Sequence, residues 1–260
     1  MLSWLLLFTF ATTAPAAEFV SIRTAKGTEI QVTFSRPAGK KLAPLVVFAP
    51  GQSCGERPFY DHVTDALHQR GLAVVRFQYA FCSRHPDGSE LPSAGLTEEV
   101  EAFQAAHAYG ASQTGVDGAQ VAFLGKSLGS VVGYRAFQQE RSASALALLT
   151  PVCTYTTDDA GKPLPEPQDV FAANYPKLGQ EARPTLFLVG ESDNLCLWPY
   201  MAKHLMEADF NTQAKLFPGD HGFGEKKADG TCDEEKTTSI QKQVAEYTAG
   251  YLARQFEAQE

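Results

Sequence analysis

The sequence lacks a long run of basic residues, and its N-terminal apolar stretch is short. Its 260 residues carry 22 Lys and Arg against 30 Asp and Glu, which gives a net charge of −8 at pH 7. Nucleic acids and anionic membrane surfaces are therefore poor partners. The apolar stretch at residues 2–10 is too short to span the hydrocarbon core of a bilayer. No internal repeat or interdomain linker is evident, so a single domain is expected.

Cysteine is scarce, and its spacing does not suggest a zinc site. The chain contains no C-x-x-C pair and no cluster of cysteine with histidine. The five cysteines are Cys54, Cys82, Cys153, Cys196 and Cys232. An odd number leaves one thiol unpaired or bonded to a partner elsewhere. We expect no metal and no organic cofactor.

The N-terminal segment resembles a secretory signal peptide. It carries no charged side chain before Glu18, and Ala14-Pro15-Ala16 provides an A-x-A cleavage site after the apolar stretch. We predict a signal peptide at residues 1–16, cut after Ala16 or Ala17, and a mature domain at residues 17–260. The protein would be exported, to the periplasm or the medium, without a stable membrane anchor, and disulfides would be possible. Because no Lys or Arg follows Met1, a buried N-terminal strand is the alternative.

Extended and helical patterns alternate through the rest of the chain. Two β-branched strands turn at Lys26-Gly27, and buried apolar strands then alternate with amphipathic helices. The predicted strands cover residues 19–25, 28–37, 44–51, 72–80, 120–124, 145–152, 184–190 and 212–219. A Pro-rich polar stretch at residues 154–167 carries no predicted strand and is followed by a short possible helix to Leu178. This alternation predicts a single α/β domain with a doubly wound, mostly parallel sheet of eight strands and helices on both faces.

Ligands of such sheets bind beyond the carboxyl ends of the strands, where a serine motif occurs. The stretch VAFLGKSLGS, residues 121–130, fits G-x-S-x-G around Ser127. A strand ends directly before this motif and a helix begins at Leu128, which is the context of a nucleophile elbow. GQSCG, residues 51–55, fits the same pattern, but a loop follows Ser53. A phosphate-binding loop would need glycine where Gln120 stands, so Lys126 is expected to be a surface or helix-start lysine.

An acid and a base follow the serine in the chain order expected of a Ser–Asp–His triad. His221 follows the last predicted strand in FPGDHGF, whereas His62, His68, His107 and His204 lie on predicted helices. Asp193 in GESDNLC is the preferred acid over Glu191, and Asp220 is expected to be a turn residue. Imidazole accepts the serine proton, and the carboxylate fixes the imidazole tautomer. The backbone N–H groups of Leu128 and Gln52, with Ser53 as an alternative to Gln52, are the predicted oxyanion donors.

Five segments and their order resemble the α/β-hydrolase superfamily, in particular its dienelactone-hydrolase-like branch of small serine hydrolases. These segments are PLVVFAPG, RGLAVVRFQYAF, VAFLGKSLGS, PTLFLVGESD and FPGDHGF. The resemblance runs from about Pro44 to the C-terminal helix, and it implies the fold and the triad Ser127, Asp193 and His221. One departure is that the branch commonly has His-Gly after the third strand, where this chain has Pro50-Gly51. That difference puts the bracing of the oxyanion loop in question.

The usual strand order of the superfamily places the cysteines in pairs. It implies disulfides Cys54–Cys82 and Cys196–Cys232, with Cys153 free, although Cys153–Cys196 also joins adjacent strands. We predict an exported serine hydrolase that cleaves a small acyl substrate, an ester or a lactone. A peptidase or thioesterase on the same triad, and a non-catalytic binding protein with this fold, are the alternatives. Arg84 and His85, in the loop at residues 82–95, are possible contacts to an anionic group of the substrate. The sequence does not indicate the oligomeric state.

Overall fold

The computed structural model describes residues 18–54, 57–84, 92–158, 161–208 and 211–258. The predicted signal peptide and His85 lie outside these residues. The described strands are β1 (Glu18–Arg23), β2 (Glu29–Ser35), β3 (Ala43–Ala49), β4 (Ala73–Phe77), β5 (Val116–Lys126), β6 (Ala143–Leu149), β7 (Thr154–Thr157), β8 (Pro163–Asp169), β9 (Thr185–Gly190) and β10 (Thr212–Phe217). The α-helices are α1 (Pro58–Gln69), α2 (Ala80–Arg84), α3 (Thr97–Ala111), α4 (Leu128–Gln139), α5 (Phe171–Asn174), α6 (Trp198–Leu205) and α7 (Glu234–Glu257), with 3₁₀ turns at Ala94–Leu96 and Leu178–Gln180.

Eight of these strands form one sheet with the order β1-β2-β4-β3-β5-β6-β9-β10. The pairs β1–β2 and β2–β4 are antiparallel, and the remaining pairs are parallel. The expected fold class is therefore confirmed: an antiparallel hairpin precedes a parallel, doubly wound sheet. Because the strands β4, β3, β5, β6, β9 and β10 run in parallel, their carboxyl ends meet along one edge.

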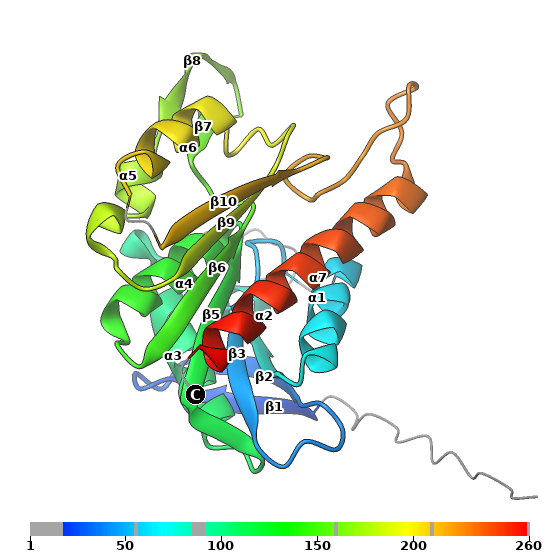
Figure 1. Cartoon of the computed structure of the whole chain (residues 1–260). Helices are drawn as coiled ribbons and strands as arrows, with labels where there is room; N and C mark the ends of the chain where they lie inside the picture. The colour runs from blue at the N-terminus through cyan, green and yellow to red at the C-terminus, as the bar shows by residue number, and fades with distance from the viewer. Residues whose placement is uncertain (1–17, 55–56, 85–91, 159–160, 209–210, 259–260) are drawn as a thin grey trace, which may run out of the picture.

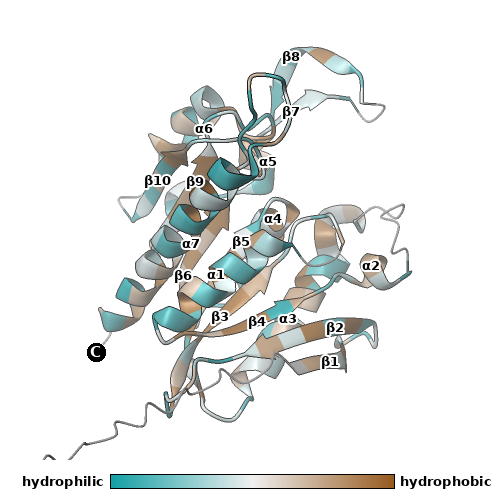
Figure 2. Cartoon of the chain, turned by 90° about the vertical axis from the view of Figure 1, so that its right-hand side faces the viewer, coloured by the Kyte–Doolittle hydropathy of each residue, from teal (hydrophilic) through white to brown (hydrophobic). Residues whose placement is uncertain are grey.

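Helices cover both faces of this sheet, as the apolar pattern of its strands requires. Every residue of β3 is buried, and successive side chains enter opposite layers: Leu45 and Val47 pack with α3 and α4, whereas Val46 and Phe48 pack with α1 and α7. Figure 1 shows α7 and α1 side by side across one face, and Figure 2 shows the apolar strands between the two helical layers. The continuous apolar runs in the sequence thus mark strands that are buried on both sides.

A small hairpin, formed by β7 and β8, stands apart from the main sheet. It projects beyond the carboxyl edge, next to α5 and α6 (Figure 1). These two strands are not among those predicted from the sequence, which shows only a Pro-rich polar stretch here. Prolines within β8 and an exposed pattern gave no strand signal, and the two short strands pair only with each other among the described residues.

The structure contains two disulfides, of which one pairing matches the expectation. Cys54 is bonded to Cys82, as the strand order implies. The predicted Cys196–Cys232 bond is wrong, because Cys196 is bonded to Cys153 and Cys232 is a free, exposed thiol. The strands β6 and β9 are neighbours, and the backbone N–H of Cys153 donates to the carbonyl oxygen of Leu195 at 2.7 Å, so the two cysteines meet directly. Among the described helices, none is long and apolar enough to cross a membrane.

Candidate active site

Ser127 occupies a strained turn between β5 and α4. Its backbone has φ 56° and ψ −121°, a region that residues other than glycine rarely adopt. The N–H of Ser127 donates to the carbonyl oxygen of Leu149, and its own carbonyl oxygen accepts from the N–H of Ser130 at 2.8 Å. These bonds hold the turn to the neighbouring strand β6 and to the first turn of α4, so the side chain projects at the carboxyl edge.

The two glycines of the motif are required by close backbone approach. A Cβ atom on Gly125 would lie 2.0 Å from the carbonyl oxygen of Gly129. A Cβ atom on Gly129 would lie 2.2 Å from the carbonyl oxygen of Ala49, at the end of β3. Both distances are far below van der Waals contact, so no larger residue fits without moving the main chain. The glycines flanking Ser127 therefore reflect the geometry of this turn.

Ser127, His221 and Asp193 form one continuous chain of hydrogen bonds. The Nε2 atom of His221 lies 2.7 Å from Oγ of Ser127, and Nδ1 lies 2.9 Å and 3.0 Å from the two carboxylate oxygens of Asp193. Because a carboxylate only accepts, Nδ1 carries the proton and Nε2 is the acceptor for the serine hydroxyl. The three predicted residues are thus brought together with the donors and acceptors that a proton transfer from serine requires.

The loops after β9 and β10 bring the acid and the base to this edge. The N–H groups of Glu191 and Ser192 donate to the carbonyl oxygens of Phe217 and Gly219, which ties the two loops together. The carboxylate of Asp193 is buried and also accepts from the N–H of Leu195 at 2.8 Å. Glu191, the alternative acid, is exposed.

Asp220 has a structural role in the turn that presents His221. Its Oδ1 atom accepts hydrogen bonds from the N–H groups of Gly222 and Gly224, at 2.7 Å and 2.9 Å. The side chain therefore fixes the backbone that follows His221. This geometry agrees with the expectation that Asp220 is a turn residue.

Two tyrosines brace the loop after β3, where the sequence departs from the usual His-Gly. The hydroxyl of Tyr79 donates to the carbonyl oxygen of Pro50 at 2.9 Å, and the N–H of Gly51 donates to the hydroxyl oxygen of Tyr60 at 3.0 Å. Burial raises the pKa of Tyr79 well above its usual value, so the hydroxyl remains a donor. The disulfide Cys54–Cys82 ties the same loop to α2. The loop is held in place without the usual histidine.

A third tyrosine, Tyr175, stabilises the turn between β5 and α4 through hydrogen bonds. Oγ of Ser130 donates to the carbonyl oxygen of Ser127 and lies 2.7 Å from the hydroxyl of Tyr175, which accepts from the N–H of Val152. Burial raises the pKa of Tyr175, which keeps this hydroxyl neutral. The first turn of α4 and the end of β6 are thus linked through a buried side chain from the segment after α5.

Ser127 lies where two hollows of the surface meet. The first, here called the His221 hollow, has a volume of about 900 Å³; its lining includes Ser53, Arg57, Lys126, His221, Thr237 and Gln241. The second, the hairpin hollow, has a volume of about 860 Å³; its lining includes Leu96, Leu128, Val131, Val152, Tyr155 and Leu164. Gln52, Ser127 and Leu195 line both. A substrate attacked by Ser127 would therefore extend in two directions.

The other candidate residues occupy different places. Ser53 and Gln52 are exposed and line the His221 hollow, so the loop predicted to supply an oxyanion donor is at the site. Arg84 forms an ion pair with Glu98 and lines neither hollow. Within the described part of the chain, no three or more His, Cys, Asp and Glu residues form a group that could hold a metal.

Several residues of the site had no signal in the sequence. Tyr60 lies on α1, Tyr79 follows β4 and Tyr175 follows α5, and only the packing of these separate segments brings the hydroxyls to the loops they support. Lys126, expected at the surface, lines the His221 hollow and is only partly exposed.

Comparisons with known proteins agree with this geometry. A family model described as "Alpha/beta hydrolase domain" matches residues 43–249. An uncharacterized protein of Mycobacterium tuberculosis (strain CDC 1551 / Oshkosh) is 26% identical over 185 residues, which cover 70% of this chain and 63% of that protein. The chain thus spans less than two thirds of the length of the curated relatives that it matches.

Solved structures with the same fold include several hydrolases. The esterase domain of a Rhodothermus marinus protein has a TM-score of 0.62 and 14% identity, with 91% of this chain and 99% of that chain covered. An alpha-beta serine hydrolase homologue from Coxiella burnetii has a TM-score of 0.62 and 15% identity, with 93% and 99% covered. The 2,6-dihydroxy-pseudo-oxynicotine hydrolase has a TM-score of 0.68 and 17% identity, with 95% and 70% covered. At these identities the likeness concerns the fold.

Proposed function

The chain belongs to the alpha/beta-hydrolase family, and within this family we propose that it is an exported serine hydrolase that cleaves a small carboxylic ester or lactone. The observation that carries the proposal is the hydrogen-bond chain from Asp193 through His221 to Ser127, with 2.7 Å between Nε2 and Oγ. A serine hydroxyl is a weak nucleophile, and an imidazole at this distance is the general base that activates it.

The first half of the reaction forms an acyl-enzyme. Oγ of Ser127 attacks the substrate carbonyl carbon while its proton passes to Nε2 of His221, and Asp193 stabilises the resulting imidazolium. The carbonyl oxygen becomes an oxyanion, for which the N–H groups of Leu128 and Gln52 are the proposed donors. When the tetrahedral intermediate collapses, the bond to the leaving group breaks and His221 returns the proton to the departing oxygen.

The second half releases the acyl group. A water molecule gives a proton to His221 and attacks the acyl carbon, which again places negative charge in the oxyanion hole. Collapse breaks the bond to Oγ, and His221 returns the proton to Ser127. The carboxylic acid leaves, and the protein is unchanged. All proton transfers use the one imidazole, so the sequence balances without a further group.

The short segment over the site, rather than a long lid, supports a small substrate. Among the described residues between β6 and β9, the short hairpin β7–β8 and α5 border the hairpin hollow, and no longer lid is present. Esterases and other hydrolases with this fold are among the similar structures. The same triad would also serve a peptidase or a thioesterase. The hydrogen bonds from Tyr60 and Tyr79 that hold the loop after β3 in place favour an enzyme over a non-catalytic binding protein.

Export is supported by the sequence and by the disulfides. Residues 1–16 are the proposed signal peptide, and residues 17–260 the mature hydrolase. The bonds Cys54–Cys82 and Cys153–Cys196 both lie at the carboxyl edge, and such bonds persist in oxidising compartments. N-terminal sequencing of the protein recovered from the periplasm and the medium tests this, with a mature N-terminus at Ala17 or Glu18 expected.

A fluorophosphonate probe tests the catalytic proposal directly. The folded protein is expected to become covalently labelled at Ser127, and Ser127→Ala is expected to abolish the label. Ser53→Ala is the matched serine variant, because Ser53 lies in the other G-x-S-x-G match, and it is expected to keep a labelled serine. Absence of label on folded wild-type protein would overturn the proposal. A panel of p-nitrophenyl esters, lactones, thioesters and aminoacyl amides then distinguishes the substrate classes.

A further inference from the structure

The proposed chemistry assigns the two hollows to the two halves of a substrate. The leaving group must receive its proton from Nε2 of His221, so it departs on the side of the imidazole. Only the His221 hollow is lined by His221, whereas the hairpin hollow is lined by a mixture of apolar side chains, such as Leu128 and Val131, and polar ones, such as Gln168. The acyl group therefore occupies the hairpin hollow and the leaving group the His221 hollow.

Lys126 lies in the leaving-group half, directly before the nucleophile. Its side chain lines the His221 hollow and runs past the oxyanion loop, since a Cβ atom on Gly51 would lie 3.5 Å from Cδ of Lys126. The residue is only partly exposed. Throughout the described ranges, the ammonium group has no hydrogen bond and no ion pair within 4.0 Å.

The charged groups around Lys126 do not neutralise it by contact. Asp193 and Asp220 approach from the loops after β9 and β10, but their carboxylates accept from His221 and from backbone N–H groups. Arg57, at the start of α1, adds a second positive charge to the lining, and Glu234, at the start of α7, is exposed.

Burial makes the protonated form of Lys126 less stable than it would be in water. It lowers the pKa of Lys126 to about 8, with Arg57 acting in the same direction and Asp193 and Asp220 opposing the shift. The group is still mainly protonated at pH 7. A half-buried ammonium without a partner destabilises the fold, and a bound anion would remove that penalty. A site of this kind beside a nucleophile suits the recognition of charge on a ligand.

We propose that Lys126, together with Arg57, binds a negative charge on the leaving group, so that the enzyme prefers esters whose alcohol half carries a carboxylate. The inference rests on the proposed function, because it uses the direction in which His221 delivers the proton. Charge-assisted hydrogen bonds from Nζ of Lys126 to the carboxylate would hold the alcohol half within reach of Nε2 of His221. The preference is expected for the leaving-group half only, since the lining of the hairpin hollow contains one cation, Arg135, which donates to the carbonyl oxygen of Gly95, and one carboxylate, Asp158.

Two matched pairs of substrates test this with the full mature chain. The first pair is 3-acetoxybenzoate and 3-acetoxybenzamide, which share the acetyl group and differ in the charge of the leaving group. The second pair is phenyl hydrogen succinate and phenyl succinamate, which share the phenol and differ in the charge of the acyl group. We expect kcat/KM to favour the carboxylate about tenfold in the first pair and not at all in the second.

Substitutions of Lys126 test whether this residue causes the preference for the carboxylate in the first substrate pair. Lys126→Met removes the charge and keeps the aliphatic chain, and it is expected to bring the ratio in the first pair to about one, whereas Lys126→Arg retains a preference. Lys41→Met is the control, because Lys41 is exposed before β3, at the opposite end of the sheet, and it should leave the ratio unchanged. An unchanged ratio in folded Lys126→Met, or a preference confined to the second pair, would overturn the proposal.

The pH dependence of the wild-type ratio provides a test without mutation. Above the pKa of about 8, Lys126 loses its proton, so the preference for the carboxylate is expected to fall as the pH rises through this value. A ratio that is constant from about pH 6.5 to about pH 9.5 would contradict the assignment. If neither substrate pair is hydrolysed and no probe label forms, the proposed function itself has failed. Calorimetric titration of Ser127→Ala with 3-hydroxybenzoate then still tests the anion site, since binding lost in the additional Lys126→Met change supports it and absence of binding overturns it.

Discussion

The hydroxyl of Tyr79 donates a hydrogen bond of 2.9 Å to the carbonyl oxygen of Pro50, 29 residues earlier in the chain. Tyr79 follows β4 and Pro50 follows β3, which are neighbouring parallel strands. The bond fixes the peptide just before Gly51 and Gln52, where the second oxyanion donor is proposed. It takes the place of bracing that the usual His-Gly would give.

Tyr79→Phe is expected to lower kcat about tenfold with a smaller change in KM, because a donor that moves weakens binding of the transition state more than of the substrate. The phenylalanine keeps the ring packing with Phe77 and Phe81. Steady-state kinetics on a p-nitrophenyl ester provide the measurement. Tyr200→Phe, on α6 and outside both hollows, is the control. Equal kinetics for Tyr79→Phe and wild type would show that the loop does not need this bond.

The elbow itself can be tested through stability. Gly129→Ala is expected to destabilise the fold by about 3 kcal/mol or to prevent folding, because its Cβ would lie 2.2 Å from the carbonyl oxygen of Ala49. Gly133→Ala, one turn further along α4, is the matched control. There the nearest atom would be 3.8 Å away, and alanine favours the helix by up to about 1 kcal/mol. Urea denaturation of both variants gives the comparison, and a Gly129→Ala protein as stable as the wild type would contradict the need for a bare backbone at this position.

The order of the elements and the candidate triad could be predicted because their signals are local. A predicted strand that ends at Leu124, directly before the G-x-S-x-G motif, and a helix that begins at Leu128 place Ser127 in the turn between them, and Asp193 and His221 likewise follow later strand ends. The α/β-hydrolase fold follows from the alternation of buried apolar runs and amphipathic helices.

The parts that sequence reasoning missed depend on contacts between distant segments. The strand β8 of the hairpin contains three prolines and has no buried face. Its sequence therefore lacks the alternation of apolar and polar residues that predicts a strand. The pairing of Cys153 with Cys196 competed with Cys196–Cys232, and only the path of the loop after β9 decides between them. The partly buried state of Lys126 depends on α1 and on the loops after β3 and β10, none of which its neighbours in sequence reveal.

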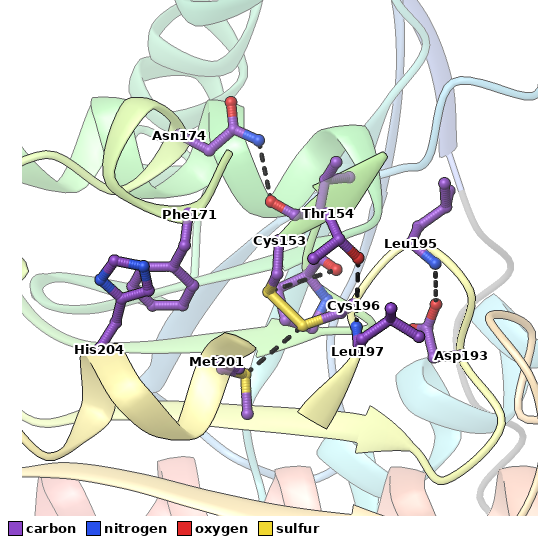
Figure 3. The surroundings of a disulfide bond; sticks show 12 residues. Cys153, Thr154, Phe171, Asn174, Asp193, Leu195, Cys196, Leu197, Met201 and His204 are labelled. Atoms are coloured by element: carbon purple, nitrogen blue, oxygen red, sulfur yellow. Dashed lines mark hydrogen bonds between the residues drawn. A yellow bond between two sulfur atoms is a disulfide. The ribbon is translucent and has the colours of Figure 1, made fainter. Parts of the chain in front are cut away.

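The Cys153–Cys196 disulfide is expected to stabilise both the fold and the position of the acid. Figure 3 shows that Cys196 lies close to Leu195, whose N–H donates to Asp193, and to Leu197, whose N–H donates to Oγ1 of Thr154. For a loop of this length, loop entropy gives about 4 kcal/mol. The double variant Cys153→Ser/Cys196→Ser should therefore have a lower midpoint in urea and a lower kcat. Cys232→Ser removes the free thiol and should leave the midpoint unchanged.

The carboxylate of Asp193 distinguishes a working triad from an accidental cluster. Asp193→Asn keeps the size of the side chain, but its amide can donate to Nδ1 of His221 and so favour the tautomer in which Nε2 carries the proton and cannot accept from Ser127. We expect kcat to fall about ten-thousandfold, as this change does in other serine triads, with the fold intact. Glu191→Gln, at the exposed alternative acid two residues earlier, is expected to retain activity. If the two variants lost activity equally, Asp193 would not be the residue that orients His221, and a fall confined to Asp193→Asn would support the triad of Ser127, His221 and Asp193.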